Sequence, residues 1–375
     1  MCRVPFRYLL SLVLFVFVIG AFAVRCESDI KERLPAAKIA RWYNNRAAAV
    51  SITYDHGNPV TKSNKRINKF VIDNGLTMDY EIVTHSYLRT RYGKKNLFRE
   101  VITPGLGYFG HGHKHIDHDQ LSYEEALASF KKCYQTISDF GLKPIAYAYP
   151  QGGGNKPETR KALADAGFLC GRLHFSNGMT NPYIVPDVQL EPEDWFALPT
   201  LVMQDKGTRQ CKKCVSTNEE LIPYLDETIR RGAWIILTYH AIGEENQYGF
   251  FKLEEFKKNI YSIKERNFWN ASMNAVTLYI RERLHAEVKL VPVLKHKKIE
   301  EILVTVADGL PNDIYDQPLT ILLDLPGSWI NKPLALVEKE KILNTFVVDS
   351  SNGMISIKPD EIERKIVMVE IASRR

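Results

Sequence analysis

The chain has 375 residues, of which 45% are hydrophobic, so it can bury the core of one large domain with a smaller one, or of two domains. Fifty Lys and Arg residues against 44 Asp and Glu residues give a formal net charge of +6 with histidine neutral. The basic residues do not form dense runs interleaved with aromatic residues, so the composition argues against a nucleic-acid-binding protein.

Residues 1–23 are typical of a secretory signal peptide. Arg3 and Arg7 precede an apolar run over residues 8–19, and an A-x-A cleavage sequence follows at residues 21–23. The apolar run is too short to span a bilayer comfortably, although an uncleaved anchor remains the alternative. We therefore expect a secreted or periplasmic protein without a stable membrane span, whose N-terminal segment covers residues 24–45.

From about residue 46, segments with strand patterns alternate with segments with helix patterns. Capping boxes at Ser122 and Thr217 mark the starts of two helices. The segments that resemble buried strands are 47–54, 80–83, 145–149 and 234–237. This alternation predicts parallel strands covered by helices, and we expect a distorted β/α barrel over residues 46–287.

Residues with useful chemistry directly follow several of these strand-like segments. They are Asp55 with His56, then His111, Tyr149 and His240. In a β/α barrel the carboxyl ends of the strands form the face on which active sites assemble. The sequence therefore predicts that these residues share one site.

The histidine pattern predicts a metal site. His111 and His115 are four residues apart and can aim two rings at one point, and His56 can supply a third. A hydrolytic zinc site typically has three protein ligands and one open position for water. Asp55 would then take a proton from that water. The alternative is that His56 binds nothing and the site is degenerate, with His240 a buried histidine of the core.

Beyond about residue 288 the pattern changes to short alternating strands. The alternating segments are 302–306, 319–325 and 365–371, and turn residues lie between them. This pattern predicts a small all-β domain over residues 288–375, built as a sandwich. A less favoured hypothesis makes the chain an interaction protein that attaches to a cell surface through this domain.

Cys211 and Cys214 form a single Cys-x-x-Cys sequence without a second pair at zinc-ribbon spacing. In an exported chain this arrangement predicts a local disulfide or two thiols rather than a metal site. Removal of Cys2 with the signal peptide would leave five cysteines, so one of them stays unpaired.

Several motifs over residues 46–284 together resemble the polysaccharide deacetylase family with the NodB homology domain, carbohydrate esterase family 4. Residues 53–57 read TYDHG where the family has T-F/Y-D-D-G. Residues 111–122 supply H-x-x-x-H followed by Leu-Ser. By this resemblance Asp55 is the general base, and the metal ligands are His56, His111 and His115. His56 stands where the family has Asp.

The remaining motifs extend the resemblance. Residues 148–152 read AYPQG, where the Gln151 backbone N–H would be the oxyanion donor and Ala148 replaces an Arg that orients the base in many members. Residues 238–240 match an L-x-H motif with Thr in place of Leu, which makes His240 the general acid. The Asp-Trp motif corresponds to Asp194 and Trp195, and Asp194 would interact with His240. Tyr149 and Trp195 would line a sugar-binding cleft.

The resemblance implies a metal-dependent hydrolase that removes N- or O-linked acetyl groups from a carbohydrate polymer or oligosaccharide. Imidazole ligands suit zinc, copper, nickel and iron. We expect Zn because three imidazoles and a water are the zinc ligands in carbonic anhydrase. The changed residues at positions 56 and 148 leave a second hypothesis open. It is a catalytically silent carbohydrate-binding protein on the same scaffold.

Overall fold

The computed structural model describes residues 33–55, 62–89, 95, 99, 103–174, 181–185, 189–207, 211, 214–350 and 352–369. The predicted signal peptide and His56 lie outside the described residues. Within those ranges, no helix is both long enough and apolar enough to cross a membrane.

The chain divides into two compact units. The larger unit contains Arg41–His285 and Leu310–Pro318. The smaller unit contains the described residues up to Ala40, then Ala286–Gly309 and the described residues from Leu319 onward. The short segment that was predicted to precede the barrel therefore contributes residues to both units.

The larger unit is built on a sheet whose strands all pair in parallel. Across the sheet, its described strands are β6 (Cys170–Arg172), β5 (Ala146–Ala148), β4 (Leu106–Gly110), β3 (Met78–Ile82), β2 (Ala48–Tyr54), β8 (Trp234–Tyr239) and β7 (Leu201–Met203), while β9 (Phe268–Asn270) pairs with β2. A parallel bridge between Arg172 and Leu198 connects β6 to the segment that leads into β7. This arrangement confirms the predicted distorted β/α barrel.

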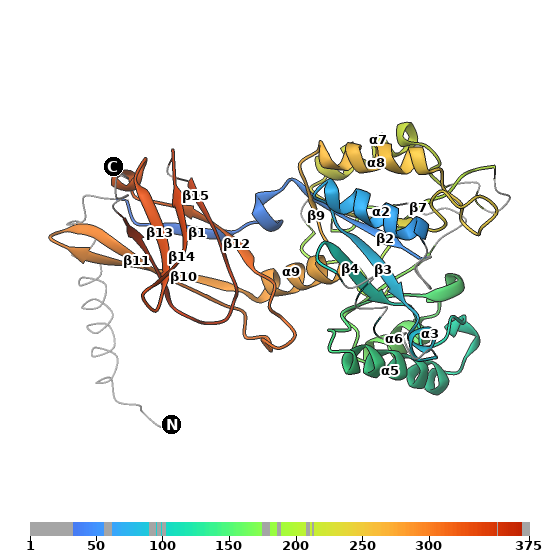
Figure 1. The fold of residues 1–375 in the computed structure, drawn as a ribbon. Helices are drawn as coiled ribbons and strands as arrows, with labels where there is room; N and C mark the ends of the chain where they lie inside the picture. Colours follow the sequence, from blue (N-terminus) through green and yellow to red (C-terminus); the bar gives the residue numbers. More distant parts are fainter. Residues whose placement is uncertain are drawn as a thin grey trace, which may run out of the picture. The chain divides into compact units, whose positions relative to one another are not determined.

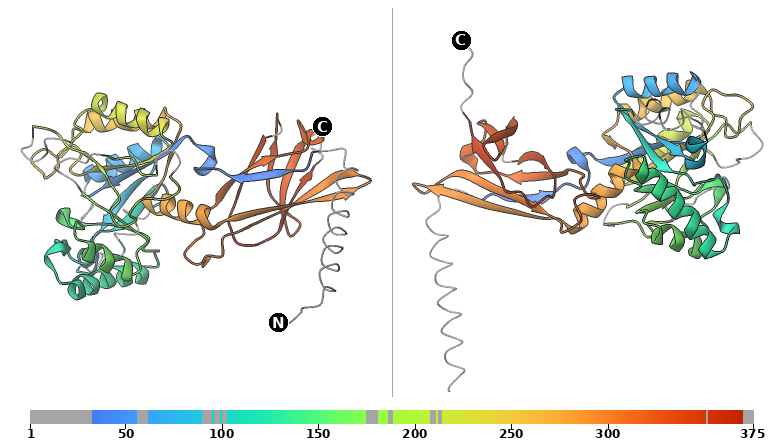
Figure 2. Two further views of the ribbon diagram at one scale, coloured as in Figure 1. Left: turned by 180° about the vertical axis from the view of Figure 1, so that it is seen from behind. Right: turned by 60° about the horizontal axis from the view of Figure 1, so that its bottom comes forward.

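Helices cover this sheet from two sides. Within the described residues, the helices of eight or more residues are α2 (Lys62–Asp73), α5 (Tyr123–Asp139), α6 (Pro157–Asp165), α7 (Asn218–Arg230), α8 (Leu253–Lys264) and α9 (Met273–His285), and α3 (Thr84–Leu88) is short. In Figure 1, α2, α7 and α8 gather on one side of the sheet and α3, α5 and α6 on the other, and Figure 2 shows the same grouping from behind.

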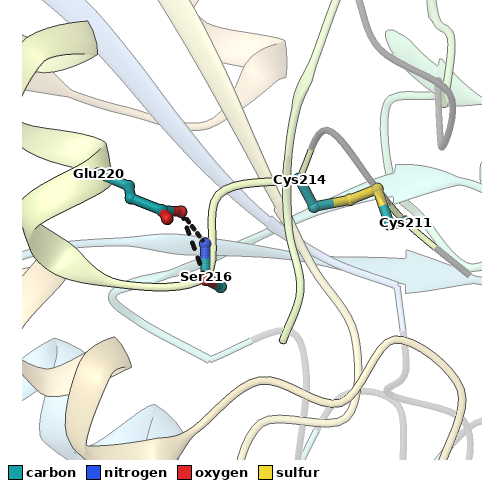
Figure 3. Close-up of a disulfide and its surroundings, with 4 residues drawn as sticks. All are labelled: Cys211, Cys214, Ser216 and Glu220. Atoms are coloured by element: carbon teal, nitrogen blue, oxygen red, sulfur yellow. Dashed lines mark hydrogen bonds between the residues drawn. A yellow bond between two sulfur atoms is a disulfide. The ribbon is translucent and has the colours of Figure 1, made fainter. Parts of the chain in front are cut away.

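Both predicted helix starts are present. Ser122 accepts a hydrogen bond from the backbone of Glu125, whose carboxylate accepts one from the Ser122 backbone, which completes a capping box. Thr217 caps α7 through Glu220, but the Glu220 carboxylate accepts from Ser216 at 2.9 Å instead. Figure 3 shows that contact beside the disulfide between Cys211 and Cys214, one of the two states expected for this pair.

The inner face of the barrel changes character along the strands. Side chains of a strand alternate between its two faces. On β2, Val50, Ile52 and Tyr54 belong to the core under the helices, whereas Ala49 belongs to a second core cluster that includes Met273 of α9. Ser51, Thr53 and Asp55 follow Ala49 on the inner face. The apolar end of this face is covered by α9, and its polar end lies at the carboxyl ends of the strands.

The smaller unit consists of two antiparallel sheets, as predicted for the C-terminal β domain. One sheet has the order β1 (Ala36–Ile39), β12 (Leu319–Asp324) and β15 (Asn352–Ile357). The other has the order β10 (Glu287–Lys295), β11 (Lys298–Ala307), β16 (Arg364–Met368), β13 (Pro333–Glu338) and β14 (Lys341–Val347). The edge strand β1 comes from the N-terminal segment, so this unit is not formed by the C-terminal residues alone.

Candidate active site

A cavity of about 490 Å³ opens at the carboxyl ends of the barrel strands. It contains six of the residues predicted to share a site or to act there, together with residues that the motifs did not indicate. The lining residues are Asp55, Glu81, His111, His115, Tyr149, Gln151, Gly152, His174, His240 and Tyr248.

Asp55 forms a buried ion pair with Arg172. The Nη2 atom of Arg172 lies 2.5 Å from Oδ2 of Asp55, and Arg172 has an exposed fraction of 0%. Burial alone would raise the pKa of Asp55, but the Arg172 charge and the nearby His240 lower the pKa to about 2. The Oδ1 atom of Asp55 is buried and accepts no hydrogen bond from any described residue. Asp55 is therefore an ionised carboxylate at the wall of the cavity, with one oxygen that accepts no hydrogen bond from the described residues.

Arg172 lies beside the position at which the third motif lacks its arginine. It is the register partner of Ala148, because β5 and β6 pair in parallel. The guanidinium also lies over the ring of Phe109, 5.4 Å from its centroid, which fixes its position from below. Sequence analysis missed Arg172. The alternation of Cys170, Arg172 and His174 on one face of a buried strand was the available signal.

His111 is oriented by the backbone of β5. Its Nδ1 lies 2.9 Å from the carbonyl oxygen of Ala148, and a carbonyl only accepts, so Nδ1 carries the proton. Burial lowers the pKa of His111 to about 3, which keeps the ring neutral. Its Nε2 points to Glu81, whose Oε2 is 3.3 Å away. Sequence analysis missed Glu81, although Asp79 and Glu81 alternate with apolar residues along β3.

His115 lies beside His111, and their ring centroids are 5.0 Å apart. The turn after β5 supports it, because the Gln151 side-chain amide donates to the His115 carbonyl oxygen at 3.0 Å. Gln151 has a φ of 55°, an uncommon backbone conformation for a residue other than glycine. Residues held in such conformations are often found at functional sites.

Tyr149 reaches the cavity with its ring, while its hydroxyl is used in the core. The hydroxyl donates to the carbonyl oxygen of Phe196 at 3.1 Å. A side chain at Gly154 or Gly171 would collide with the ring, with a Cβ atom at 2.4 Å or 2.8 Å from Tyr149 atoms. Both glycines are therefore needed to place Tyr149 at this wall of the cavity.

His240 follows β8 and lines the same cavity as His111. Burial lowers the pKa of His240 to about 3, so its ring is neutral before a substrate binds. Its ring centroid is 5.1 Å from that of His174 and 5.0 Å from that of the half-exposed Tyr248. Nδ1 of His240 and both ring nitrogens of His174 are buried without a hydrogen-bond partner among the described residues. Sequence analysis missed His174 and Tyr248.

Asp194 and Trp195, which were predicted to belong to the site, are not among the residues that line the cavity. Oδ2 of Asp194 pairs with Arg160 at 3.1 Å, and the carboxylate lines a separate cavity. The ring of Trp195 lies under the Arg281 guanidinium at 4.3 Å, and its indole N–H donates to Glu191. The reason is that this segment runs along β6, with the Gly171 N–H donating to the Trp195 carbonyl. Hydrogen bonding to a strand fixes the segment away from His240.

The residues of the cavity fit a divalent cation in part. A metal-binding histidine usually donates its second ring N–H to a backbone carbonyl or carboxylate, as His111 does to Ala148. His115 and the anionic Asp55 are close to it in the same cavity. Within the described ranges, no three Cys, His, Asp or Glu side chains already form a group with metal-binding geometry, and the third predicted ligand, His56, is outside those ranges.

Comparison with other proteins finds similarity only at the level of solved structures. No protein-family model matches the chain, and no curated protein matches it. A candidate polysaccharide deacetylase from Mycobacterium smegmatis is 15% identical with a TM-score of 0.46, over 66% of this chain and 94% of that one. A family 4 carbohydrate esterase from Streptomyces lividans, in complex with acetate, is 13% identical with a TM-score of 0.40, over 61% and 94%.

A pseudoenzyme of carbohydrate esterase family 4 from Bacillus anthracis is also similar, with 14% identity and a TM-score of 0.36 over 59% of this chain and 62% of that one. These proteins are named for the family that the sequence motifs resemble. Because the identities and TM-scores are low, the proposals below rest on the side chains of the cavity and on the motifs.

Proposed function

We propose that this protein is a metal-dependent hydrolase that removes acetyl groups from an N- or O-acetylated carbohydrate. The observation that carries the proposal is the buried pair of Asp55 and Arg172 in one cavity with His111, His115 and His240. An ionised base and three imidazoles that line the same cavity are groups that can serve acyl hydrolysis.

In the proposed reaction Asp55 accepts a proton from the attacking water, and the acetyl C–N or C–O bond breaks to release acetate. His240 then gives a proton to the leaving amine or hydroxyl. Because His240 is neutral beforehand, it must receive that proton during the reaction, and Asp55, whose charge acts on it, is the available source. One proton thus passes from water to the leaving group.

Two further groups would serve the same step. The Gln151 backbone N–H is our candidate donor to the tetrahedral oxyanion, and one such donor is typically worth about 3 kcal/mol. A divalent cation, which we expect to be Zn, would lower the pKa of the bound water and polarise the acetyl carbonyl. His111 and His115 would hold it, with His56 as a further candidate ligand. We also propose that the signal peptide directs the protein out of the cytoplasm.

The second candidate, a silent carbohydrate-binding protein, was favoured by the absence of an arginine at position 148. Arg172 now weakens that reason, because its guanidinium already holds Asp55 from the neighbouring strand. The remaining reason is the histidine at position 56.

The first test measures acetate released from a panel of N- and O-acetylated oligosaccharides, together with the zinc content of the purified protein. We expect Asp55→Asn to keep its zinc and its fold while losing roughly 10²–10⁴-fold in turnover, the usual effect of removing a general base. His111→Ala should lose both zinc and turnover. Acetate release at the wild-type rate by Asp55→Asn would remove Asp55 as the base. Glycan binding without acetate release by the wild type would favour the silent protein.

A further inference from the structure

We propose that Glu81 is a metal ligand of this site and that it supplies, from β3, the carboxylate that the first motif lacks at position 56. The inference rests on the proposed function in one respect only, namely that the cavity binds a divalent cation.

The first argument is the orientation of the His111 ring. Its Nδ1 lies 2.9 Å from the Ala148 carbonyl oxygen, which only accepts, so Nδ1 carries a proton and Nε2 is the ring nitrogen left for another partner. That nitrogen lies 3.3 Å from Oε2 of Glu81, and both side chains are buried. An imidazole nitrogen and a carboxylate oxygen are both ligand atoms that zinc prefers, so this contact places two such atoms side by side at the wall of the cavity.

The second argument is the distance itself. Bonds of zinc to imidazole nitrogen and carboxylate oxygen are about 2.0–2.2 Å, so two ligand atoms on a tetrahedral zinc lie about 3.4 Å apart. A charge-assisted hydrogen bond between the same two groups would bring them to about 2.7–2.9 Å. The observed 3.3 Å agrees with two ligands of one metal ion and is too long for such a hydrogen bond.

The third argument is the position of Glu81 in the sheet. β3 lies between β2 and β4, which carry the first motif and His111 at their ends. Tyr54 pairs in register with Tyr80, so Glu81 lies on β3 at the level of Asp55, one residue before position 56. A carboxylate from β3 can therefore enter the same cavity as one that follows β2, and Glu81 lines it.

The fourth argument is that a second group of the site, the arginine of the third motif, is also supplied by a neighbouring strand. Arg172 on β6 stands in register with Ala148 on β5, where the family motif has its arginine. In both cases the cavity keeps the chemical group while the adjacent strand provides it. Glu81 is also only 6% exposed, and a buried carboxylate beside the anionic Asp55 is stabilised by a divalent cation.

The experiment compares zinc binding and the visible spectrum of the cobalt-substituted protein for wild type, Glu81→Gln and the control Asp79→Asn. Asp79 is on the same strand and face, two residues earlier, and accepts from the Met273 backbone instead of lining the cavity. Loss of a group that merely orients a ligand typically weakens metal affinity 10–100-fold, so we expect Glu81→Gln to weaken it by at least about 100-fold. The cobalt spectrum should change in this variant and stay as in wild type for Asp79→Asn.

Each outcome decides between the two proposals. If wild type binds no zinc, both the metal-dependent function and the role of Glu81 are wrong. If wild type binds zinc and releases acetate while Glu81→Gln keeps both its affinity and its cobalt spectrum, the ligand proposal is wrong and the function stands. If Glu81→Gln binds zinc more weakly but its cobalt spectrum is unchanged, Glu81 only orients His111, and the proposal that Glu81 is a ligand is wrong. Glu81→Asp keeps the charge but is one methylene shorter. It should alter the spectrum in the same direction, which provides a test if Glu81→Gln does not fold.

Discussion

Asp55 and Asp79 lie on the same inner face of the barrel, one at the cavity and the other one layer below, and both are buried. Burial raises the pKa of Asp79 to about 8 although the Met273 N–H donates to it, whereas the pKa of Asp55 is lowered to about 2 in spite of its burial. Arg172 lowers the pKa of both groups, but it bonds directly only to Asp55, where His240 and His111 lower the pKa further. Burial alone therefore does not determine the charge of a carboxyl group here, and the direct bond to a guanidinium accompanies the ionised carboxylate.

The largest expected effect is that of Arg172→Met. Breaking a buried ion pair by removing one partner typically costs about 3–5 kcal/mol of stability. The pKa of Asp55 should rise because burial then acts without an opposing charge, so the acid limb of the kcat/KM profile should move to higher pH. A pH–rate profile and urea unfolding measure both. Arg160→Met, which breaks the exposed pair with Asp194, should cost at most about 1 kcal/mol and leave the acid limb in place.

The same comparison can be sharpened by returning the arginine to its family position. In the double variant Arg172→Ala with Ala148→Arg, the guanidinium would start from the register partner of residue 172. We expect part of the lost activity to return and the acid limb to move back towards lower pH. An acid limb unchanged from Arg172→Ala alone would show that the position on β6, and not only the charge, is required.

Asp79→Asn tests the second carboxyl group of this comparison, through the pH dependence of stability. The pKa of Asp79 is about 8 in the fold and about 3.9 in an unfolded chain, so its contribution to stability is complete below pH 4 and is lost as pH rises towards 8. The asparagine variant does not titrate. Its free energy of unfolding should therefore rise relative to that of wild type by up to about 1.4 kcal/mol per pH unit between pH 5 and 7. Urea unfolding at pH 5, 6 and 7 checks this, and a difference independent of pH would contradict the raised pKa.

Gly249→Ala should have the smallest effect on stability and a selective effect on turnover. A Cβ atom at Gly249 would lie 2.6 Å from Cβ of His240, and the residue has a φ of 68°. We expect turnover to fall at least about tenfold while zinc affinity is kept, because only the proposed proton donor is displaced. Gly75→Ala is the matched control, since Gly75 has a φ of 72° and open space around it. Both variants should lose about 1 kcal/mol of stability, and equal turnover in both would exclude the displacement of His240.

The predictable part of the site consists of residues whose positions follow from their own strand. Asp55, His111 and His240 come directly after buried strands, and His115 is four residues from His111, so the local pattern was sufficient to bring them to one face. The sequence did not indicate Glu81, Arg172 or His174. Each of these side chains belongs to the site through contact with a residue from another strand. Their alternation on β3 and β6 was visible, but not the direction in which that face points.

The Asp-Trp motif shows the converse case. Asp194 and Trp195 matched a local pattern, yet hydrogen bonds to β6 commit their segment to another part of the surface. A short motif in a loop carries no information about the strand against which that loop lies.

The sequence by itself determined the alternating strands and helices, the capped helix starts and the histidines that follow the strands, because these depend on residues close together in the chain. The order and register of the strands were decided only in the tertiary structure. They place Arg172 against Asp55 and Glu81 against His111, since such pairs depend on which strands become neighbours and on how far each one is shifted along the other.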